Sequence, residues 1–285
     1  MTADVLQDSR VGRLIEQALH EDIGFGDVTS ESVIPEEQLG RAVLQAKENG
    51  VVSGMEIVGI VFQYTDTQIT TKTGIADGCV VMAGQILGEV DGPVRGILLG
   101  ERVALNFLQR MSGIATLTHK YVHAVEGTRA KITDTRKTVP GLRVLDKKAV
   151  RDGGGVNHRF GLDQMVLIKD NHIVSAGGIT EAVARCRSYL RARDLEIKIE
   201  VETTSMAEVE EALNCKVDRI MLDNFDLGVM SEAVHLIGHA TEVEASGGVT
   251  LQTVRPIAET GVDFISVGAL THSPKGLDIS LEMVP

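Results

Sequence analysis

The spacing of apolar residues changes along the chain and divides it into two parts. Residues 9–20 place Val11, Ile15 and Leu19 on one face, which predicts a short helix. From 41 to 97 the apolar residues come in short runs separated by glycines, which favours strands and turns. The predicted strands are 41–46, 50–53, 68–72, 79–82 and 86–90. Helical periodicity returns at 98–111, so the first part is predicted to be a mostly β domain that a helix follows.

After Gly113 each apolar run is followed by a polar or glycine-rich end and then by a helical pattern. Strand and helix that alternate at short spacing imply parallel pairing of the strands. The predicted strands are 131–133, 165–168, 197–201, 219–222, 242–245 and 264–267, and the predicted helices are 180–190, 206–213, 227–237 and 251–260. The second part is therefore an α/β domain with a parallel sheet of six identified strands.

The ends of these six strands are polar or rich in glycine. The ends are 134–137, 169–171, Glu202, 223–224, 246–248 and 268–269. In a parallel α/β barrel all such ends lie on one rim, where the active site is built. An open doubly wound sheet is the competing architecture, and it would focus a ligand at one switch point. Polar ends at every strand favour the barrel.

Composition and charge narrow the classes of function. Hydrophobic residues make up 43% of the 285 and charged residues 24%, as in an ordinary globular protein. A net charge of -12, 3% aromatic residues and no tryptophan argue against a general nucleic-acid binder. The three cysteines, Cys79, Cys186 and Cys215, have neither CxxC nor metal-ligand spacing, which disfavours a disulfide framework or a zinc site. The polar N-terminus does not resemble a signal peptide, so we expect a cytoplasmic protein.

Cations gather between 134 and 172 although the chain as a whole is acidic. Arg136 and Lys137 follow one strand, Arg159 follows a run of three glycines, and Lys169 follows another strand. Arginine offers a planar fork for carboxylate or phosphate, and lysine offers a compact point charge. The pattern predicts a site for a small molecule with several negative charges.

Carboxylates and glycines at the later strand ends complete the predicted site. Glu200 and Glu202 share one face of a strand, because side chains alternate, and the spacing alone does not choose between them. Asp223 ends the next strand, and such carboxylates suit ribose hydroxyls or Mg²⁺. Ser246-Gly247-Gly248 and Gly268-Ala269 favour a phosphate site, since glycines let backbone N–H groups approach an anion closely.

Several motifs together resemble one enzyme family. They are TRKTVPGLR at 135–143, GGGVNHR at 153–159 and LIKDNH at 167–172, with HED at 20–22, ERVALN at 101–106, LDNF at 222–225, SGG at 246–248 and VGALTH at 267–272. The set, in this order, resembles the quinolinate phosphoribosyltransferases (nicotinate-nucleotide pyrophosphorylases, decarboxylating), which are type II phosphoribosyltransferases. The resemblance covers nearly the whole chain.

The resemblance implies a reaction, a fold and an assembly. Quinolinate and phosphoribosyl pyrophosphate would give nicotinate mononucleotide, pyrophosphate and carbon dioxide with Mg²⁺ as cofactor, a step of NAD biosynthesis. The fold would be α/β: an N-terminal open α/β sandwich over 1–112, to which the tail 273–285 returns, and an incomplete, about six-stranded TIM-like barrel over 113–272. The assembly would be a homodimer in which Arg102 is donated across the interface.

The resemblance also implies roles for individual residues. Arg136, His158 and Arg159 would face the dicarboxylate, and Lys137, Lys169, Glu200 and Asp223 would act in catalysis. Glu200 rather than Glu202 would be the carboxylate that binds the metal together with Asp223. The substrate-binding set would be Arg102, Thr135, Arg136, Lys137, His158, Arg159, Lys169, Glu200, Asp223, Ser246, Gly247, Gly248, Val267, Gly268 and Ala269.

Three other functions compete with this interpretation. A paralogous phosphoribosyltransferase-like protein associated with molybdenum transport would share the fold, but the set Arg136, His158 and Arg159 weighs against it. A non-catalytic anion-binding module would not need carboxylates for a metal. Another barrel enzyme that acts on a sugar phosphate would explain the glycines but not the excess of cations.

Overall fold

The computed structural model describes residues 8–284 and divides them into two compact units. The first unit contains the chain up to His119, then Thr138–Gly154, then the chain from Ala269 onward. The second unit contains Lys120–Lys137 and Gly155–Gly268. The sequence-based domain limits, 1–112 and 113–272 with a returning tail, stay a prediction.

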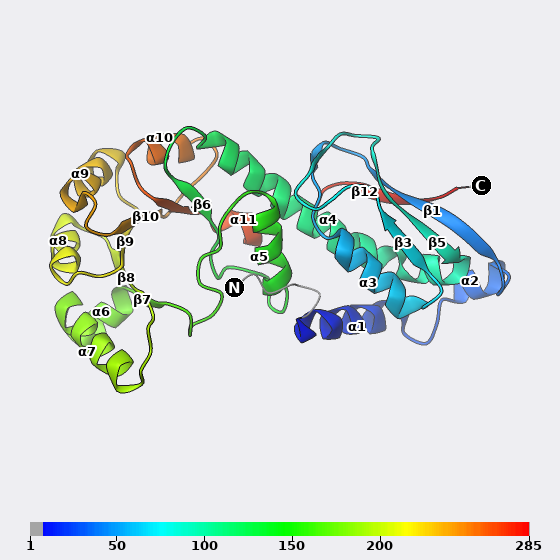
Figure 1. The fold of residues 1–285 in the computed structure, drawn as a ribbon, viewed down its shortest axis with the longest axis horizontal. Helices are drawn as coiled ribbons and strands as arrows, with labels where there is room; N and C mark the ends of the chain where they lie inside the picture. The colour runs from blue at the N-terminus through cyan, green and yellow to red at the C-terminus, as the bar shows by residue number, and fades with distance from the viewer. Residues whose placement is uncertain (1–7, 285) are drawn as a thin grey trace. The chain divides into compact units, whose positions relative to one another are not determined.

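An antiparallel sheet forms the centre of the first unit, with strand order β12-β1-β5-β3 (Figure 1). Its strands are β1 (Leu39–Ala46), β3 (Thr70–Thr73), β5 (Ile86–Pro93) and β12 (Ile279–Val284). The last strand pairs with the first, from Arg41 opposite Val284 to Ala46 opposite Ile279. A separate two-stranded ribbon joins β2 (Gly50–Val51) to β4 (Val80–Val81). All five strands predicted in this region are present, some of them shorter.

The helices of the first unit differ more from the prediction than its strands do. They are α1 (Ser9–Ile23), α2 (Val28–Val33), α3 (Met55–Thr65), α4 (Val94–Ala124), whose residues after His119 belong to the second unit, α5 (Arg143–Asp152) and α11 (Ala269–His272). Helix α1 was predicted, and its Asp8 side chain caps it by accepting the N–H of Arg10. Helix α3 was not predicted, because its nearly continuous apolar run carries no 3.6-residue polar repeat. Helix α4 extends well beyond the predicted 98–111 at both ends.

The second unit is a six-stranded parallel sheet with strand order β6-β11-β10-β9-β8-β7. Its strands are β6 (Lys131–Thr133), β7 (Val166–Ile168), β8 (Ile199–Thr203), β9 (Arg219–Asp223), β10 (Glu242–Ser246) and β11 (Phe264–Ser266). Its helices are α6 (Asp170–Ala176), α7 (Ile179–Ala192), α8 (Met206–Asn214), α9 (Leu227–Ile237) and α10 (Val254–Glu259). Figure 1 shows helices α7 to α10 arranged along the outer side of the strands.

The strand order decides between the two architectures that the sequence left in competition. Strands β7 to β11 follow one another in chain order, and β6, the first strand, lies beside β11, the last. Such an order has no reversal, so it has no switch point of the doubly wound kind. The unit is an incomplete α/β barrel that stays open between β6 and β7, and the predicted fold class is confirmed.

Charged side chains on the inner face of this barrel are the feature that prepares the site. Glu200 of β8 pairs in register with Arg219 of β9, and Glu244 of β10 pairs with Met221 of β9. Because paired positions in a sheet point to the same side, these side chains share the inner face. Glu200 and Glu244 are fully buried. A barrel interior is usually filled by branched apolar residues, so carboxylates here need a specific reason.

No helix of the described residues has both the length and the apolar character needed to cross a bilayer. Cys79, Cys186 and Cys215 are free thiols in the structure.

Candidate functional site

The predicted site residues of the second unit lie where its parallel strands end. Thr135, Arg136 and Lys137 follow β6, and Lys169 follows β7. Further along the same edge Asp223 ends β9, Ser246 ends β10, and Val267 and Gly268 follow β11. The carboxyl ends of parallel strands meet at one edge, so residues far apart in the sequence converge there.

Two guanidinium groups form the cationic part of this edge. Arg159 is partly buried, and its Nη1 donates to the carbonyl of Met165 at 2.9 Å. Burial lowers the pKa of Arg159, and the positive charge of Arg136 lowers it further, while Glu200 opposes both effects. Arg136 is exposed and Arg159 is half-buried, so the two like charges repel each other, and an anion between them would remove that repulsion.

The imidazole of His158 is held in one tautomer. The backbone N–H of Arg159 donates to its Nδ1 at 2.8 Å, so Nδ1 must accept and the ring proton must lie on Nε2. Nε2 lies 3.1 Å from Oε2 of Glu200 and 3.5 Å from Oε1 of Glu244. The ring therefore donates toward two carboxylates, and both of its nitrogens contact groups of the protein.

A buried aspartate fixes the backbone beside this ring. Asp134 is completely buried, and its Oδ1 accepts the backbone N–H of His158 at 2.8 Å. Its other oxygen accepts the side-chain amide of Asn157 at 2.7 Å. Since Asp134 directly follows β6, these bonds join the loop that carries Arg159 to the first strand of the barrel.

Glu200 and Glu244 are two carboxylates confined in one buried volume. Burial raises the pKa of Glu200 to about 7, against the charges of Arg219, Arg159 and Lys169, which lower it. Burial likewise raises the pKa of Glu244 to about 7, and the charge of Glu200 adds to the rise. Oε1 of Glu200 is buried and, among the described residues, has no hydrogen-bond partner. This oxygen is placed for a partner that residues 8–284 do not supply.

These carboxylates allow a test of whether the site suits a metal ion. The possible ligand atoms of His158, Glu200 and Glu244 all lie within 4.8 Å of one another. His158 does not fit as a ligand, since its Nε2 carries the ring proton while Nδ1 accepts the Arg159 N–H. Carboxylate oxygens are the donors that Mg²⁺ prefers, and the orphaned Oε1 of Glu200 fits that preference.

Glu202 and Lys169 form an ion pair above the buried carboxylates. Nζ of Lys169 lies 2.5 Å from Oε2 of Glu202, and the lysine side chain is 45% exposed. The backbone N–H of Lys169 also donates to Nδ1 of His172 at 3.0 Å, at the start of α6. The two glutamates that the sequence could not distinguish thus have different surroundings, since Glu200 faces His158 and Glu202 faces Lys169.

A tight junction links Asp223 to the glycine-rich loop after β10. Asn224 has a left-handed backbone with φ 57°, and its N–H donates to the carbonyl of Ser246 at 2.9 Å. Its side-chain amide donates to Oδ2 of Asp223 at 2.8 Å. A Cβ on Gly247, whose φ is 95°, would lie 2.2 Å from Oδ1 of Asn224, whereas one on Gly248 would meet nothing within 4 Å. Glycine is therefore required at 247 for two reasons, the close approach of Asn224 and the positive φ of its own backbone.

The remaining predicted residues have simpler surroundings. Thr135 accepts the backbone N–H of Lys137 at 3.0 Å, and the N–H of Val267 donates to the carbonyl of Thr133 at 2.9 Å. Arg102 and Ala269 belong to the first unit, where Arg102 is exposed on α4 and Ala269 begins α11.

Sequence reasoning missed four residues of this region: Arg219, Asn224, Glu244 and Ser266. A signal for one of them was present in β10, where Glu242 and Glu244 alternate with apolar residues. In a parallel strand that is buried on both faces, such alternation indicates a polar inner face.

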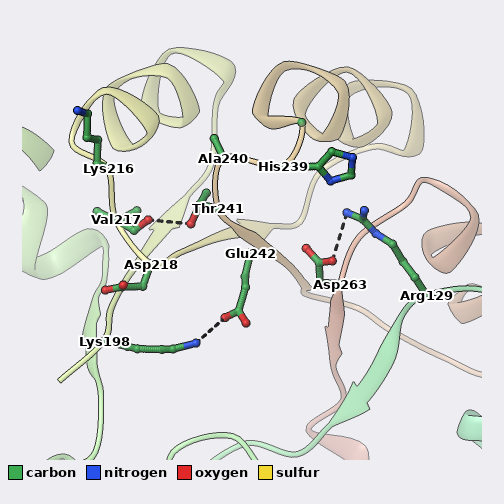
Figure 2. Close-up of a pocket in the computed structure, with 11 residues that line it drawn as sticks. Arg129, Lys198, Lys216, Val217, Asp218, His239, Ala240, Thr241, Glu242 and Asp263 are labelled. Atoms are coloured by element: carbon green, nitrogen blue, oxygen red, sulfur yellow. Dashed lines mark hydrogen bonds and ion pairs between the residues drawn. The ribbon is translucent and has the colours of Figure 1, made fainter. Parts of the chain in front are cut away.

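A polar hollow of about 520 Å³ opens at the other end of the same strands. Figure 2 shows Lys198 paired with Glu242 and Arg129 paired with Asp263 in it. Asp263 also accepts the N–H of Val243 at 2.9 Å. These carboxylates tie together the strand starts, so the hollow is structural and is separate from the candidate site.

Comparisons with known proteins agree with this geometry. Residues 27–112 match the model of the quinolinate phosphoribosyl transferase N-terminal domain, and residues 114–282 match that of the C-terminal domain. The chain is 46% identical to quinolinate phosphoribosyltransferase (decarboxylating) 1b of Nicotiana tabacum, over 95% of this chain and 81% of that protein. It is 44% identical to a probable nicotinate-nucleotide pyrophosphorylase (carboxylating) of Synechocystis, over 95% of this chain and 91% of that protein.

Solved structures give the same answer for the fold. NadC from Streptococcus pyogenes is 38% identical and superposes with a TM-score of 0.92, covering 97% of this chain and 98% of that one. The nicotinate-nucleotide pyrophosphorylase of Francisella tularensis is 39% identical with a TM-score of 0.92, covering 96% of each chain.

Proposed function

The chain belongs to the quinolinate phosphoribosyltransferase family, and on that premise we propose that it transfers the phosphoribosyl group of phosphoribosyl pyrophosphate to quinolinate with decarboxylation. The products are nicotinate mononucleotide, pyrophosphate and carbon dioxide. The enzyme is then a pentosyltransferase of NAD biosynthesis.

The observation that carries the proposal is the pair of guanidiniums at the barrel edge. Arg136 and Arg159 come from different loops, and the pKa of Arg159 is lowered first by burial and then by the charge of Arg136. A ligand with two adjacent carboxylates removes this repulsion and gives each guanidinium a planar partner. Quinolinate is such a ligand, and a monocarboxylate is not.

The phosphoribosyl donor occupies the rest of the edge in this proposal. Lys137 and Lys169 bind the pyrophosphate and phosphate oxygens, and the latter must first leave its ion pair with Glu202. The backbone N–H groups of 246–248 and 267–269, with the hydroxyl of Thr135, hold the 5′-phosphate end. Loops rich in glycine after barrel strands suit phosphate because the N–H groups can converge on it.

Mg²⁺ is the proposed cofactor. Glu200 and Asp223 would hold it together with substrate phosphates, and the ion would neutralise charge on the pyrophosphate. Substitutions Glu200→Gln and Asp223→Asn should raise the Mg²⁺ and phosphoribosyl pyrophosphate concentrations needed for half-maximal rate by roughly tenfold. Glu202→Gln is the matched comparison on the same strand, and calorimetric titration with quinolinate alone should give an unchanged affinity in Asp223→Asn and Glu202→Gln. An equal loss of both substrates in Asp223→Asn would contradict the division of labour.

The chemistry needs positioning and charge stabilisation rather than a nucleophilic triad. The bond from the ribose to pyrophosphate loosens toward an oxocarbenium-like state, and the quinolinate nitrogen attacks the anomeric carbon. Lys137 and Lys169 stabilise the departing pyrophosphate. The ring nitrogen is then positively charged, so it stabilises the carbanion that loss of carbon dioxide leaves at the 2-position.

A direct assay tests the function. The purified protein is incubated with quinolinate, phosphoribosyl pyrophosphate and Mg²⁺, while carbon dioxide and nicotinate mononucleotide are measured. Nicotinate in place of quinolinate is the control, because it carries one carboxylate and cannot release carbon dioxide in this reaction. Absence of quinolinate-dependent product would refute the proposal and would favour one of the competing functions.

We also propose a homodimer in which Arg102 completes the partner's site. Arg102 is an exposed arginine on α4, so its charge is available to a second chain. Mixing inactive Arg102→Ala with inactive Lys169→Ala makes about half of all dimers mixed, and half of the sites in those are intact. Recovery of roughly a quarter of the wild-type activity is expected, and complete exchange without recovery would place Arg102 elsewhere.

The cytoplasm is the proposed location. Three free cysteines suit a reducing compartment. Some relatives are chloroplastic or mitochondrial proteins, so fractionation of the source cells is the appropriate test.

A further inference from the structure

Glu244 is a fully buried charged group of the second unit to which the proposed reaction assigns no part. It lies on β10 with no exposed surface, on the inner face of the barrel. A carboxylate at such a position destabilises the folded protein unless its oxygens accept hydrogen bonds. The groups that satisfy them show what the residue does.

Two hydrogen-bond donors and an imidazole surround this carboxylate. Nη1 of Arg219 donates to Oε2 at 2.8 Å, and the hydroxyl of Ser266 donates to Oε1. Nε2 of His158 lies 3.5 Å from Oε1. The guanidinium of Arg219 in turn stacks on the ring of Phe264, 3.9 Å from its centroid. Glu244 is thus held from three sides, and it presents a fixed acceptor to the imidazole.

The orientation of the His158 ring in turn fixes the backbone of Arg159, the arginine assigned to the substrate carboxylates. Its Nε2 proton is donated to Glu200, with Glu244 3.5 Å away on the same side, so its Nδ1 is left to accept the N–H of Arg159 at 2.8 Å. If the ring changed tautomer, a protonated Nδ1 would face that N–H, and if the ring turned over, its Cδ2–H would do so. In either case the N–H of Arg159 would lose its acceptor and the loop would shift.

We propose that Glu244 is a positioning residue for the carboxylate end of the substrate: anchored by Arg219 and Ser266, it orients the His158 ring, and the ring sets the backbone of Arg159. This inference rests on the proposed function for the identity of the ligand, since Arg159 is there assigned to quinolinate. Glu244 itself does not touch the substrate.

The variant Glu244→Gln tests the proposal without creating a cavity. Its amide can still accept from Arg219, but its NH₂ group then faces the other two donors, Ser266 and His158. The quinolinate KM should rise roughly tenfold, while the KM for phosphoribosyl pyrophosphate should change less than about twofold. Ser266→Ala removes one anchor and should shift the quinolinate KM in the same direction by a smaller factor.

Glu242→Gln is the matched control on the same strand. Oε2 of Glu242 also accepts from Arg219, at 3.0 Å and 3.2 Å, yet its side chain is 36% exposed and has no contact with His158. Both variants therefore remove a charge partner of Arg219, and only one of them changes the surroundings of the ring. Equal effects of the two variants, or equal loss of both substrates in Glu244→Gln, would overturn the proposal.

A spectroscopic measurement separates this inference from the function. Two-dimensional ¹⁵N–¹H spectra of the imidazoles, with His158→Gln used for assignment, report which nitrogen of His158 carries the proton. A proton on Nε2 in the wild type that moves or exchanges in Glu244→Gln, but not in Glu242→Gln, supports the proposal even if quinolinate is not the substrate. A ring spectrum unchanged in Glu244→Gln would overturn it whatever the assay shows.

Discussion

Buried charges are arranged in opposite ways in the two units. In the first unit, fully buried Asp146 accepts two bonds from Arg110, at 2.9 Å and 2.8 Å. Lys148 there lies between two carboxylates, at 2.6 Å from Asp77 and 2.7 Å from Asp152. In the second unit Arg219 pairs with Glu244, but like charges adjoin as well, with Glu200 beside Glu244 and exposed Arg136 beside half-buried Arg159.

The difference separates charges that maintain the fold from charges kept for a ligand. The oppositely charged pairs that involve Asp146 and Lys148 hold helix α5 in place. Their charges are already paired, so they are not available to bind a substrate. Like charges that adjoin, such as buried Glu200 and Glu244, destabilise the protein, and such groups cluster at sites where a ligand binds. The contrast can be tested with substitutions in both units.

Breaking an opposite pair should have the largest effect. Arg110→Ala leaves Asp146 buried without its guanidinium, and removal of one partner from a buried pair typically costs about 3–5 kcal/mol of stability. Urea unfolding should show a loss of unfolding free energy of that size, seen as a lower midpoint. Arg41→Ala, which loses an exposed pair with Asp91, should cost less than about 1 kcal/mol. Similar midpoints for the two variants would contradict the structural role of the buried pair.

Removing one of two like charges should instead affect binding. Arg136→Ala or Arg159→Ala should weaken quinolinate binding by roughly 1.5–3 kcal/mol, because each takes a charged donor from a carboxylate. The free energy of unfolding should fall much less than in Arg110→Ala. Calorimetry with each substrate, with exposed Arg185→Ala as control, measures this. Unchanged quinolinate affinity in both folded variants would remove the basis of the assignment.

The paired carboxylates should give the stability a distinct pH dependence. The pKa values of Glu200 and Glu244 are raised to about 7 by burial, above the ordinary value of 4.5, so the folded state holds more protons between those values. Their contribution is complete below pH 4.5 and is lost as the pH rises through 7, by on the order of 2 kcal/mol. The difference in unfolding free energy between wild type and Glu244→Gln should follow this curve, whereas Glu242→Gln should not alter it. A flat difference curve would show that burial does not raise the pKa of Glu244.

The smallest expected effect concerns two adjacent glycines of the second unit, Gly247 and Gly248. Gly248→Ala should cost about 1 kcal/mol of stability, since its φ of 58° strains any other residue but its surroundings are open. Gly247→Ala should cost more, and it should also reduce use of phosphoribosyl pyrophosphate, because its Cβ displaces Asn224 from Asp223. In an Asn224→Gly background much of that extra loss should disappear. If the two alanine variants behave alike, Asn224 does not couple the two loops.

Most of the fold could be predicted because its signals are local. Apolar runs that end in glycine or polar residues gave all six barrel strands within about two residues of their observed limits. Helices α3 and α5 were not predicted, and each has a physical reason. Helix α3 is apolar on nearly all sides, so it shows no helical repeat. Helix α5 buries Asp146, Lys147 and Lys148, and charged residues are normally expected to be exposed. The domain limits and the residue roles stay predictions.

The sequence by itself determined the class of fold, the family and the residue types that gather at the strand ends, since these depend on periodicity and on motifs in a fixed order. Only the tertiary structure decided which charges meet. It placed Glu200 against His158 and Glu202 against Lys169, although the two glutamates are two residues apart on one strand face. It also brought Glu244 and Arg219 beneath the ring. Such contacts depend on strand register and on burial. Both are set by the packing of the whole barrel, so the residues next to each glutamate in the sequence do not predict them.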